Sequence, residues 1–429
     1  GRRGGIDMMV AMNPQTWAAD LEEIEPGGYL FYDNTRPRLP SELRDDITVI
    51  GMPLTEICNA VYSDPRQRQL FKNIVYVGAL SVLLDMDPAI IEELLAEQFQ
   101  GKEKLIASNV QALKLGRDFA TEHLSFPLPI RVQRAHRVGQ KVFLDGNTAA
   151  GLGAVYGGAT VCAWYPITPS TSVAEAFMQY CAEFRVDAEG RHNYAIVQGE
   201  DELASIGIVV GAGWNGSRAF TATSGPGISL MTEFIGLAYF AEIPITLVNV
   251  QRGGPSTGMP TRTQQADILA CAYASHGDTK HVLLFPEDPR ECFEHTATAL
   301  DLADRLQTPV FVMTDLDIGM NERLCEPLTW DDARDYDRGK VMSADDLEQK
   351  DFGRYKDVDG DGIPWRTLPG THPTRGSYFT RGTTRDAYAR YSERGPDYIY
   401  NVQRLLHKFK TAAKLVPQPE VRAAAKRTR

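Results

Sequence analysis

Hydrophobic and polar positions alternate along most of this chain in a pattern that predicts strands and helices in turn. Between residues 146 and 325, short apolar runs such as GATVCAWYPI, NYAIVQG, RAFTATSG and ITLVNVQ are followed by longer stretches with helical periodicity. Apolar strands that alternate with helices are typical of a parallel sheet covered on both faces. We therefore expect an α/β fold with a doubly wound parallel sheet, whose ligands bind beyond the carboxyl ends of the strands.

The segments on either side of residues 146–325 have different patterns. Residues 1–123 begin with three apolar runs, DMMVAMN, GGYLFYDN and DITVIGMPL, and are then mostly helical, which predicts a smaller α/β domain. Residues 124–145 lose this periodicity and read as a linker. Residues 326–429 have few apolar runs before a helical stretch at 398–415, so we expect an extended connection. Because the smaller domain lacks expected first strands, we expect the chain to be part of a longer protein.

Composition narrows the class of protein. The chain has 429 residues, 43% hydrophobic and 24% charged, which are values for a water-soluble globular protein. Its net charge of −11 argues against a nucleic-acid partner, which would need clustered basic charge. The apolar runs are all shorter than the roughly 18–20 residues of a membrane span, so no membrane partner is expected.

Sequence spacing predicts no metal site on this chain. The six cysteines are scattered without a C-x-x-C pair, so neither a zinc ribbon nor an iron–sulfur cluster is indicated. Unpaired cysteines in a chain of this length are typical of a cytoplasmic protein. The run DVDGDG resembles the start of a calcium loop, but Leu368 stands where that motif needs a bidentate glutamate.

The stretch YPITPST joins an apolar run to a helical run. Pro166 and Pro169 restrict the backbone around Thr168 and remove two N–H donors. This pattern predicts either a rigid turn, in which Thr168 bonds its own backbone, or a hydroxyl held for a ligand. Ser172 and Glu175 have the spacing of a capping box, so we expect Ser172 to cap the helix that follows.

Three acidic residues, Glu200, Asp201 and Glu202, cluster where another strand ends and a very apolar helix begins. Acidic groups at a helix N-terminus are favoured by the helix dipole, and this structural role is one interpretation. The other interpretation places the Glu202 carboxyl in an apolar interior, where it could share a proton with a basic ring nitrogen.

Two further loops follow strand-like runs. In TATSGPG, Gly225 and Gly227 allow either a tight turn or the close approach of a flat ligand, and no P-loop pattern occurs in the chain. The loop VQRGGPSTGMPT carries Arg252 and several hydroxyls, among them Thr261. An arginine at a strand's carboxyl end is suited to bind a carboxylate or phosphate, although an ordinary surface loop is the alternative.

Taken together and in this order, GNTAAGLGAVYGG, YPITPST, GEDELAS, TATSGPG, VQRGGPSTGMPT and DGDGIPWRTLPG resemble the alpha subunit of 2-oxoacid:ferredoxin oxidoreductases, most closely the 2-oxoglutarate branch. The resemblance implies that residues 146–325 bind the pyrimidine end of thiamine diphosphate, and that residues 1–123 are part of a gamma domain fused in front. Residues 326–429 would lead toward a C-terminal domain not included here. It also implies a heterodimer or heterotetramer in which a beta subunit holds Mg²⁺ and an iron–sulfur cluster.

The same resemblance implies roles for individual residues. Glu202 would hydrogen-bond the aminopyrimidine ring of the cofactor and promote its imino form. Thr168 would contact the substrate near its reacting end, and Arg252 and Thr261 would bind the substrate's carboxylates. Further cofactor contacts are expected from Tyr165, Pro166, Ile167, Ser224, Gly225, Pro226 and Gly227.

The implied reaction is the oxidative decarboxylation of 2-oxoglutarate with coenzyme A to succinyl-coenzyme A, carbon dioxide and reduced ferredoxin. It would require the beta subunit. Three alternatives stay open: a broad-specificity or branched-chain 2-oxoacid enzyme, a non-oxidative decarboxylase, and a non-catalytic scaffold subunit. The expected partners are therefore the beta subunit and ferredoxin.

Overall fold

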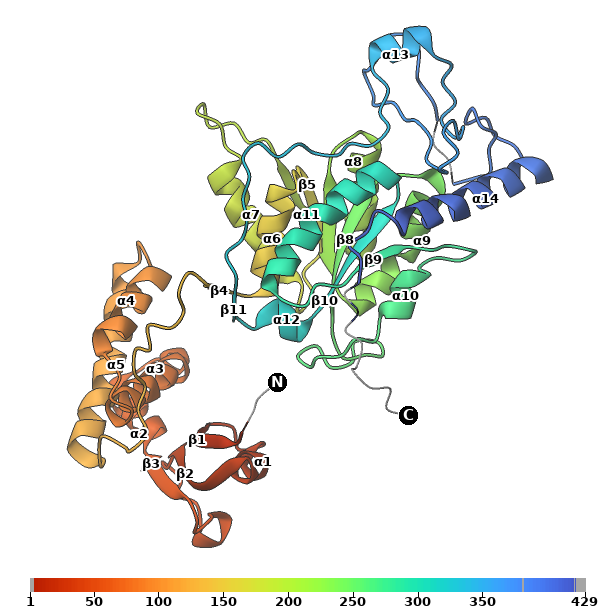
Figure 1. The fold of residues 1–429 in the computed structure, drawn as a ribbon. Helices are drawn as coiled ribbons and strands as arrows, with labels where there is room; N and C mark the ends of the chain where they lie inside the picture. The colour runs from red at the N-terminus through yellow and green to blue at the C-terminus, as the bar shows by residue number, and fades with distance from the viewer. Residues whose placement is uncertain (1–3, 380–381, 420, 422–429) are drawn as a thin grey trace. The chain divides into compact units, whose positions relative to one another are not determined.

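The computed structural model describes residues 4–379, 382–419 and 421, and the chain divides into two compact units, Gly1–Arg137 and Val138–Arg429 (Figure 1). The boundary lies inside the stretch 124–145. Among the described residues, no helix is both long enough and apolar enough to cross a membrane. All six cysteines are free and buried.

The first unit is a small α/β fold. Its three strands form a parallel sheet in the order β1-β2-β3. Helices α3 and α5 pack very closely at two glycines, because a Cβ on Gly78 would lie 2.1 Å from the Leu113 carbonyl oxygen and one on Gly116 would lie 1.8 Å from that of Val75. The elements are β1 (Ile6–Ala11), α1 (Trp17–Glu22), β2 (Ile24–Asp33), β3 (Thr48–Met52), α2 (Leu54–Val61), α3 (Pro65–Leu83), α4 (Pro88–Gln98) and α5 (Glu103–His123).

The second unit is built on a six-stranded sheet in the order β6-β5-β7-β8-β10-β9, and every strand pair is parallel. Every residue of β7, β8 and β10 is buried, as their continuous apolar runs predict. Strand β6 forms one edge. The strands are β5 (Val161–Trp164), β6 (Ala195–Gln198), β7 (Ala219–Thr223), β8 (Ile245–Gln251), β9 (Val282–Leu284) and β10 (Pro309–Asp315).

Helices cover both faces of this sheet and form two separate hydrophobic cores (Figure 1). One core is shared by α6 (Gly146–Tyr156), α7 (Thr171–Phe184) and α11 (Pro289–Leu306). The other is shared by α8 (Glu202–Trp214), α9 (Gly225–Ala241) and α10 (Ile268–Ala272). The predicted doubly wound α/β class is therefore confirmed.

The segment that follows the sheet is extended but firmly attached. After α12 (Leu316–Met320), β11 (Arg323–Cys325) pairs antiparallel with β4 (Val142–Leu144). Between β11 and α14 (Gly395–Ala412), the described residues contain one helix, α13 (Ala344–Gln349). The segment is poor in apolar residues, and buried ion pairs anchor it, such as those of Glu242 with Arg404 and Lys408.

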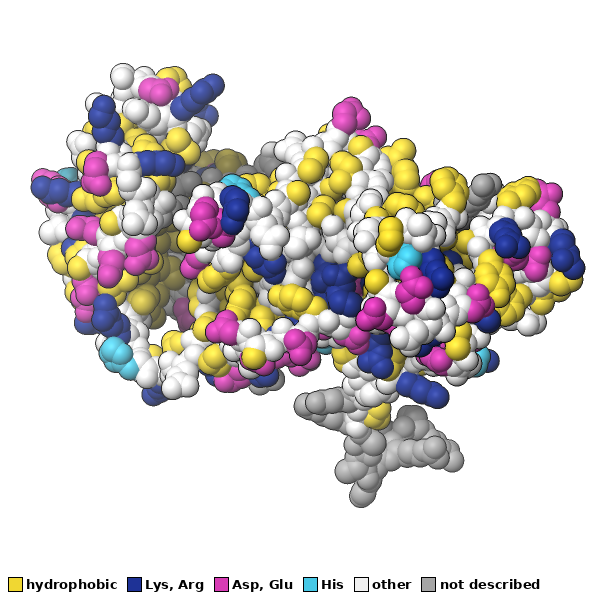
Figure 2. Space-filling model, turned by 90° about the horizontal axis from the view of Figure 1, so that it is seen from above, with side chains coloured by type: hydrophobic (Ala, Val, Ile, Leu, Met, Phe, Trp, Pro, Cys, Tyr) yellow, Lys and Arg dark blue, Asp and Glu magenta, His cyan; other side chains and the backbone are white. Residues whose placement is uncertain are grey.

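Charged side chains are mixed on the molecular surface. On the face shown in Figure 2, acidic and basic groups lie among hydrophobic and neutral ones, without an extended basic patch. This distribution agrees with the net charge of −11.

Candidate functional site

The loop after β5 holds Thr168 at the carboxyl edge of the sheet. The predicted capping box at Ser172 is wrong, because α7 already begins at Thr171 and Ser170 occupies the N-cap position. A turn closes earlier than expected: Ser170 N donates to the Ile167 carbonyl oxygen at 2.9 Å, and Ile167 N donates to Thr171 Oγ1 at 3.1 Å. Ser172 lies inside the helix and accepts a hydrogen bond from Asn147 Nδ2 at 2.9 Å.

The structure brings Thr168 and Arg252 together. Arg252 directly follows β8, is 6% exposed, and donates from Nη1 to the Thr168 carbonyl oxygen at 2.6 Å. Its Nη2 donates to the Thr257 carbonyl oxygen at 3.1 Å, and its Nε is buried without a partner in the described part of the chain. The Thr168 side chain itself is exposed. Arg252 is thus buried at the strand end and held in place by two hydrogen bonds. It is not an ordinary surface-loop residue.

Glu202 lies in the first turn of α8 and is 7% exposed. Asp201 is the N-cap residue, and its side chain accepts from Ala204 N at 2.6 Å. Among the described residues, no hydrogen bond or ion pair engages the Glu202 carboxylate. Because Asp201 already performs the capping role, Glu202 is left as a buried acid that is available to a ligand.

The TSGPG loop packs against Glu202. Ser224 is the N-cap residue of α9, and the helix begins at Gly225. A Cβ on Gly227 would lie 3.0 Å from Glu202 Cγ and 2.0 Å from Thr223 Oγ1, so this position requires glycine. The hydroxyls of Thr223 and Ser224 are buried and have no hydrogen-bond partner among the residues that the structure describes. Such groups are costly to bury unless a ligand or water satisfies them.

Thr261 is exposed, unlike the buried Arg252 and Glu202. Its side chain is exposed, and its carbonyl oxygen accepts from Arg262 Nη1 at 3.4 Å. Among the described hydrogen bonds, none links it to Arg252. Of the residues after β5, Pro166 is exposed, whereas Tyr165 and Ile167 are half-buried.

A polar network that the sequence analysis missed lies beneath the loop of residues 252–267. Gln251 donates from Nε2 to the Thr314 carbonyl oxygen at 3.1 Å and accepts from Asp267 N at 3.2 Å. Gln265 donates to Asp315 Oδ2 at 2.8 Å. These bonds tie the loop's end to β8 and β10. The signal that could have revealed them is the presence of amides in the apolar run ITLVNVQ.

Within this network, Asn249 lies near a carboxyl group. Its Nδ2 is 3.4 Å from Asp267 Oδ2, and its Oδ1 is buried with no partner among the described residues. A Cβ on Gly225 would lie 2.8 Å from Asp267 Oδ1, so this carboxyl touches the TSGPG loop. Burial raises the pKa of Asp267, and the amide of Asn249 and the charge of Arg252 oppose the rise.

The outer face of α8 is apolar and exposed next to Glu202. Leu203 is 41% and Ile208 37% exposed, and Ala204 and Gly211 are exposed with them. No charged residue occurs in this helix after Glu202. An exposed apolar helix face of this kind is typical of a surface that another protein covers.

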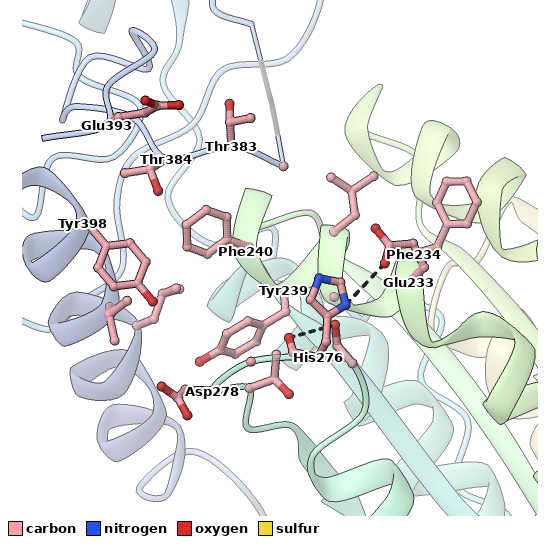
Figure 3. A pocket seen from close by; sticks show the side chains of 18 of the residues that line it. Glu233, Phe234, Tyr239, Phe240, His276, Asp278, Thr383, Thr384, Glu393 and Tyr398 are labelled. Atoms are coloured by element: carbon pink, nitrogen blue, oxygen red, sulfur yellow. Dashed lines mark hydrogen bonds and ion pairs between the residues drawn. The ribbon is translucent and has the colours of Figure 1, made fainter. Parts of the chain in front are cut away.

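A cavity of about 610 Å³ lies away from these residues (Figure 3). It is lined by the second half of α9, the loop at 275–279 and the start of α14, with Tyr239 and Tyr398 pointing toward it. At its edge, His276 Nδ1 lies 3.4 Å from Glu233 Oε2. No predicted site residue lines this cavity. The TSGPG loop lies at the start of α9, whereas the cavity lies along the second half of that helix.

The carboxylates of the acidic run DVDGDG bind a lysine and backbone N–H groups of the same chain. Lys340 Nζ lies 2.7 Å from Asp359 Oδ2 and 2.9 Å from Asp361 Oδ1. Asp357 accepts hydrogen bonds from the backbone of Gly360 and Gly362. Among the described residues, no group of three or more His, Cys, Asp or Glu side chains is arranged to hold a metal ion.

A buried glutamate, a Gly-Pro-Gly turn and a buried arginine thus lie at the carboxyl ends of the strands of a doubly wound sheet, which is where such folds bind their ligands. Residues 152–354 match the family model of the thiamine diphosphate-binding domain of pyruvate flavodoxin/ferredoxin oxidoreductase, and residues 1–119 match that of pyruvate ferredoxin/flavodoxin oxidoreductase. The chain belongs to the 2-oxoacid:ferredoxin oxidoreductase family, as its motifs indicate.

Named relatives agree with this assignment. The chain is similar to the alpha subunit of 2-oxoacid:ferredoxin oxidoreductase 2 of Aeropyrum pernix, with 31% identity over 85% of this chain and 63% of the relative. It is 31% identical to the 2-oxoglutarate oxidoreductase subunit KorA of Mycobacterium tuberculosis, over 72% of this chain and 50% of the relative. The chain therefore spans between half and about two thirds of the length of these relatives.

A solved structure is similar over almost the whole chain. It is the 2-oxoglutarate:ferredoxin oxidoreductase of Magnetococcus marinus, determined with 2-oxoglutarate, coenzyme A and succinyl-coenzyme A bound. The TM-score is 0.79 at 29% sequence identity, and the match covers 97% of this chain and 70% of that one.

Proposed function

We propose that this chain is the alpha subunit of a thiamine diphosphate-dependent enzyme that converts 2-oxoglutarate and coenzyme A to succinyl-coenzyme A and carbon dioxide, with reduction of ferredoxin. The observation that carries the proposal is Glu202, a buried carboxylate without a hydrogen-bond partner among the described residues, in the first turn of α8. The ligands bound to the Magnetococcus marinus enzyme support the choice of 2-oxoglutarate.

The residues around Glu202 fit the aminopyrimidine end of thiamine diphosphate. The unpartnered hydroxyls of Thr223 and Ser224 and the free Oδ1 of Asn249 are buried polar atoms that still need partners. Bound thiamine diphosphate supplies a carbon nucleophile for the 2-oxo group. Glu202 would share a proton with a basic ring nitrogen, and the neighbouring Gly225 would let the backbone approach the ring. We propose further contacts to the cofactor from Tyr165, Pro166, Ile167, Pro226 and Gly227.

Arg252 would hold the substrate. A guanidinium carries five N–H donors, and the bonds to the carbonyl oxygens of Thr168 and Thr257 use two of them. The others are available to a carboxylate, and the buried setting strengthens that interaction. The exposed Thr168 side chain would contact the reacting end of the substrate, and the exposed Thr261 would add a hydroxyl to the carboxylate site of Arg252. A dicarboxylate would satisfy the arginine better than pyruvate does.

A partner subunit would complete the site. The exposed apolar face of α8, formed by Leu203, Ala204, Ile208 and Gly211, is adjacent to Glu202 and would be covered by a beta subunit. That subunit would hold the cofactor's diphosphate, Mg²⁺ and an iron–sulfur cluster that reduces ferredoxin. The free buried cysteines agree with a reducing compartment, and we propose the cytoplasm.

The two units would have different roles in the enzyme. We propose residues 1–123 as a gamma-type domain against which coenzyme A enters, residues 124–145 as a linker, and residues 146–325 as the pyrimidine-binding domain. Residues 326–429 would connect to further sequence of the kind found in the longer relatives.

The test is reconstitution of this chain with its beta subunit. The complex should contain thiamine diphosphate and iron, and should reduce ferredoxin with 2-oxoglutarate only when coenzyme A is present. Equal rates with pyruvate or branched-chain 2-oxoacids would replace the proposal with a broad-specificity enzyme. Carbon dioxide release without reduction of ferredoxin would indicate a non-oxidative decarboxylase, and full activity of the beta subunit alone would indicate a scaffold role.

A further inference from the structure

The motif GNTAAGLGAVYGG, residues 146–158, forms α6 and the turn that follows it. Its glycines let two other helices approach closely. A Cβ on Gly151 would lie 2.8 Å from Phe177 N of α7, and one on Gly153 would lie 2.4 Å from a carbonyl oxygen of α11. Helix α6 is therefore a firmly packed support. Its second residue, Asn147, is 0% exposed and carries an amide that the proposed substrate site does not use.

The Asn147 amide binds the loop that carries Thr168. Its Nδ2 donates to the Pro169 carbonyl oxygen at 2.8 Å and to Ser172 Oγ at 2.9 Å. An asparagine amide has two N–H donors, so these bonds use both of them. One side chain of α6 therefore joins the last residue of the YPITP sequence to the first turn of α7.

Three successive carbonyl oxygens of this loop are held by three different groups. That of Ile167 accepts a hydrogen bond at 2.9 Å from the backbone of the turn that opens α7. That of Thr168 accepts from Arg252 at 2.6 Å, and that of Pro169 accepts from Asn147 at 2.8 Å. The last two donors come from outside the turn, one from the end of β8 and one from α6. They fix the backbone on both sides of the peptide bond between Thr168 and Pro169.

The amide of Asn147 is kept at an energetic cost. Its Oδ1 is buried and has no hydrogen-bond partner among the described residues. This oxygen lies against Gly319 of α12, where a Cβ would be 2.6 Å away. An apolar side chain could fill the same space without leaving an unsatisfied acceptor. The contribution of Asn147 is therefore the two hydrogen bonds that it donates, and not its packing alone.

We propose that Asn147 is a positioning residue, which holds the Pro169 carbonyl oxygen and thereby keeps Thr168 where its hydroxyl meets the substrate. This inference rests on the proposed function, in which Thr168 contacts the reacting end of a 2-oxoacid. Without the bond to Pro169, the backbone after Thr168 loses its support from α6, and the hydroxyl occupies the reactive position for a smaller fraction of the time. Asn147 acts only through this loop, so cofactor binding at Glu202 does not depend on it.

Hydrogen exchange of the full chain tests whether Asn147 holds the loop. In Asn147→Ala, the amides of residues 167–171 should exchange about 5- to 20-fold faster than in wild type, as for the loss of one hydrogen bond. Asn401→Ala is the matched control, because Asn401 is also 0% exposed, donates to the carbonyl oxygens of Arg385 and Asp397, and has a buried Oδ1 without a partner among the described residues. It should leave this exchange unchanged. Equal exchange in Asn147→Ala and wild type, or equal acceleration in both variants, would overturn the proposal.

Kinetics of the complex reconstituted with the beta subunit test whether Asn147 acts through Thr168. Asn147→Ala should lower kcat/KM for the preferred 2-oxoacid by about 3- to 10-fold, as expected for Thr168→Val, with unchanged thiamine diphosphate content. When Thr168→Val is already present, adding Asn147→Ala should cost less than about 2-fold, because the positioned hydroxyl is gone. Unchanged kcat/KM in Asn147→Ala, or effects that multiply in the double variant, would contradict the proposal.

Two further points keep the outcomes distinct. Asn147→Leu, which preserves the approximate size of the side chain, replaces Asn147→Ala in both experiments if the alanine variant does not fold. A wild-type complex that turns over no 2-oxoacid would refute the proposed function, whereas the exchange experiment needs no activity and still decides whether Asn147 holds the loop.

Discussion

Arg252 Nη1 donates a hydrogen bond of 2.6 Å to the backbone carbonyl oxygen of Thr168, although 84 residues separate the two in sequence. The bond joins the loops that follow β5 and β8. These strands are not neighbours, because β7 lies between them. The arginine therefore bridges the carboxyl edge of the sheet and fixes the backbone of Thr168 from outside its own turn.

Replacement of Arg252 by methionine should raise the KM for 2-oxoglutarate by about 10- to 100-fold, the range for the loss of a charged hydrogen bond. The carbonyl oxygens of Thr168 and Thr257 would also lose their hydrogen-bond donors, so kcat should fall while KM rises. Steady-state kinetics of the reconstituted complex with 2-oxoglutarate and pyruvate measures both effects.

Arg262→Met is the matched control, because Arg262 is exposed on the same loop. It should keep wild-type kinetics. If Arg252→Met leaves the preference for 2-oxoglutarate over pyruvate unchanged, Arg252 does not bind a substrate carboxylate.

Substitution of Thr168 by valine removes the side-chain hydroxyl and keeps the backbone carbonyl group, so it tests the role of the hydroxyl alone. The bond from Arg252 to the Thr168 carbonyl oxygen should survive, because it involves no side-chain atom of Thr168. We expect kcat/KM to fall by about 3- to 10-fold, as for one neutral hydrogen bond. Thr232→Val on α9 serves as the control, since its hydroxyl bonds only to the helix backbone. Unchanged kinetics in Thr168→Val would make Thr168 a turn residue.

Replacement of Glu202 by glutamine removes a carboxylate that the described part of the protein leaves without a hydrogen bond. Because glutamine has the same shape, the fold should be kept, whereas turnover should fall by about 10²- to 10⁴-fold as for a lost acid–base group. Glu200→Gln is the control, at an exposed position two residues away. Turnover at the wild-type rate in Glu202→Gln, with cofactor bound, would remove Glu202 from the mechanism.

A charge on the outer face of α8 should prevent assembly with the beta subunit. Ile208 is 37% exposed, so Ile208→Asp should fold normally but bind its partner at least about 100-fold more weakly, because an aspartate buried in the interface has no counter-charge. Met178→Asp, on α7 at the other face of the sheet and 44% exposed, is the control. Size-exclusion chromatography and circular dichroism measure assembly and fold. Normal assembly of Ile208→Asp would place the beta subunit elsewhere.

The pH dependence of stability should include a contribution from His281. Burial lowers the pKa of its imidazole to about 4, against the opposing effect of its 2.9 Å hydrogen bond to the Ala274 carbonyl oxygen. The unfolded chain, with the ordinary pKa of 6.5, takes up a proton first as the pH falls, so acid favours unfolding between pH 6.5 and 4. The loss should reach about 2 kcal/mol at pH 5.

Urea unfolding at pH 7.5, 6 and 5 measures this effect. His281→Gln can still donate to Ala274 and should lose less stability than wild type on acidification. His276→Gln, at a histidine whose side chain is 85% exposed, should behave like wild type. An identical slope in His281→Gln and wild type would assign the acid sensitivity to other groups.

Much of the fold follows from local pattern. The continuous apolar runs of β7, β8 and β10 predict strands buried on both faces, and all three are fully buried. Apolar strands that alternate with helical periods leave few arrangements other than a doubly wound sheet. The position of the site at the carboxyl ends of the strands follows from the same rule.

Local pattern was less reliable at helix ends and in the extended segment. The spacing of Ser172 and Glu175 predicted a cap, but a turn at Ile167 starts the helix two residues earlier. Residues 326–412 offered few apolar positions, and their attachment through Glu242, Arg404 and Lys408 could not be predicted, because charge pairing between distant residues leaves no periodic signal.

The sequence by itself determined the class of the protein: the order of its strands and helices, the glycines of its turns, and the motifs that place it in its family. Only the tertiary structure decided which chemical groups are available. It showed that Asp201 performs the capping and leaves Glu202 free, that Arg252 meets Thr168, and that Thr261 stands apart in solvent. Local pattern is set by each residue's own backbone and burial preference, whereas the availability of a polar group depends on every neighbour that folding brings to it.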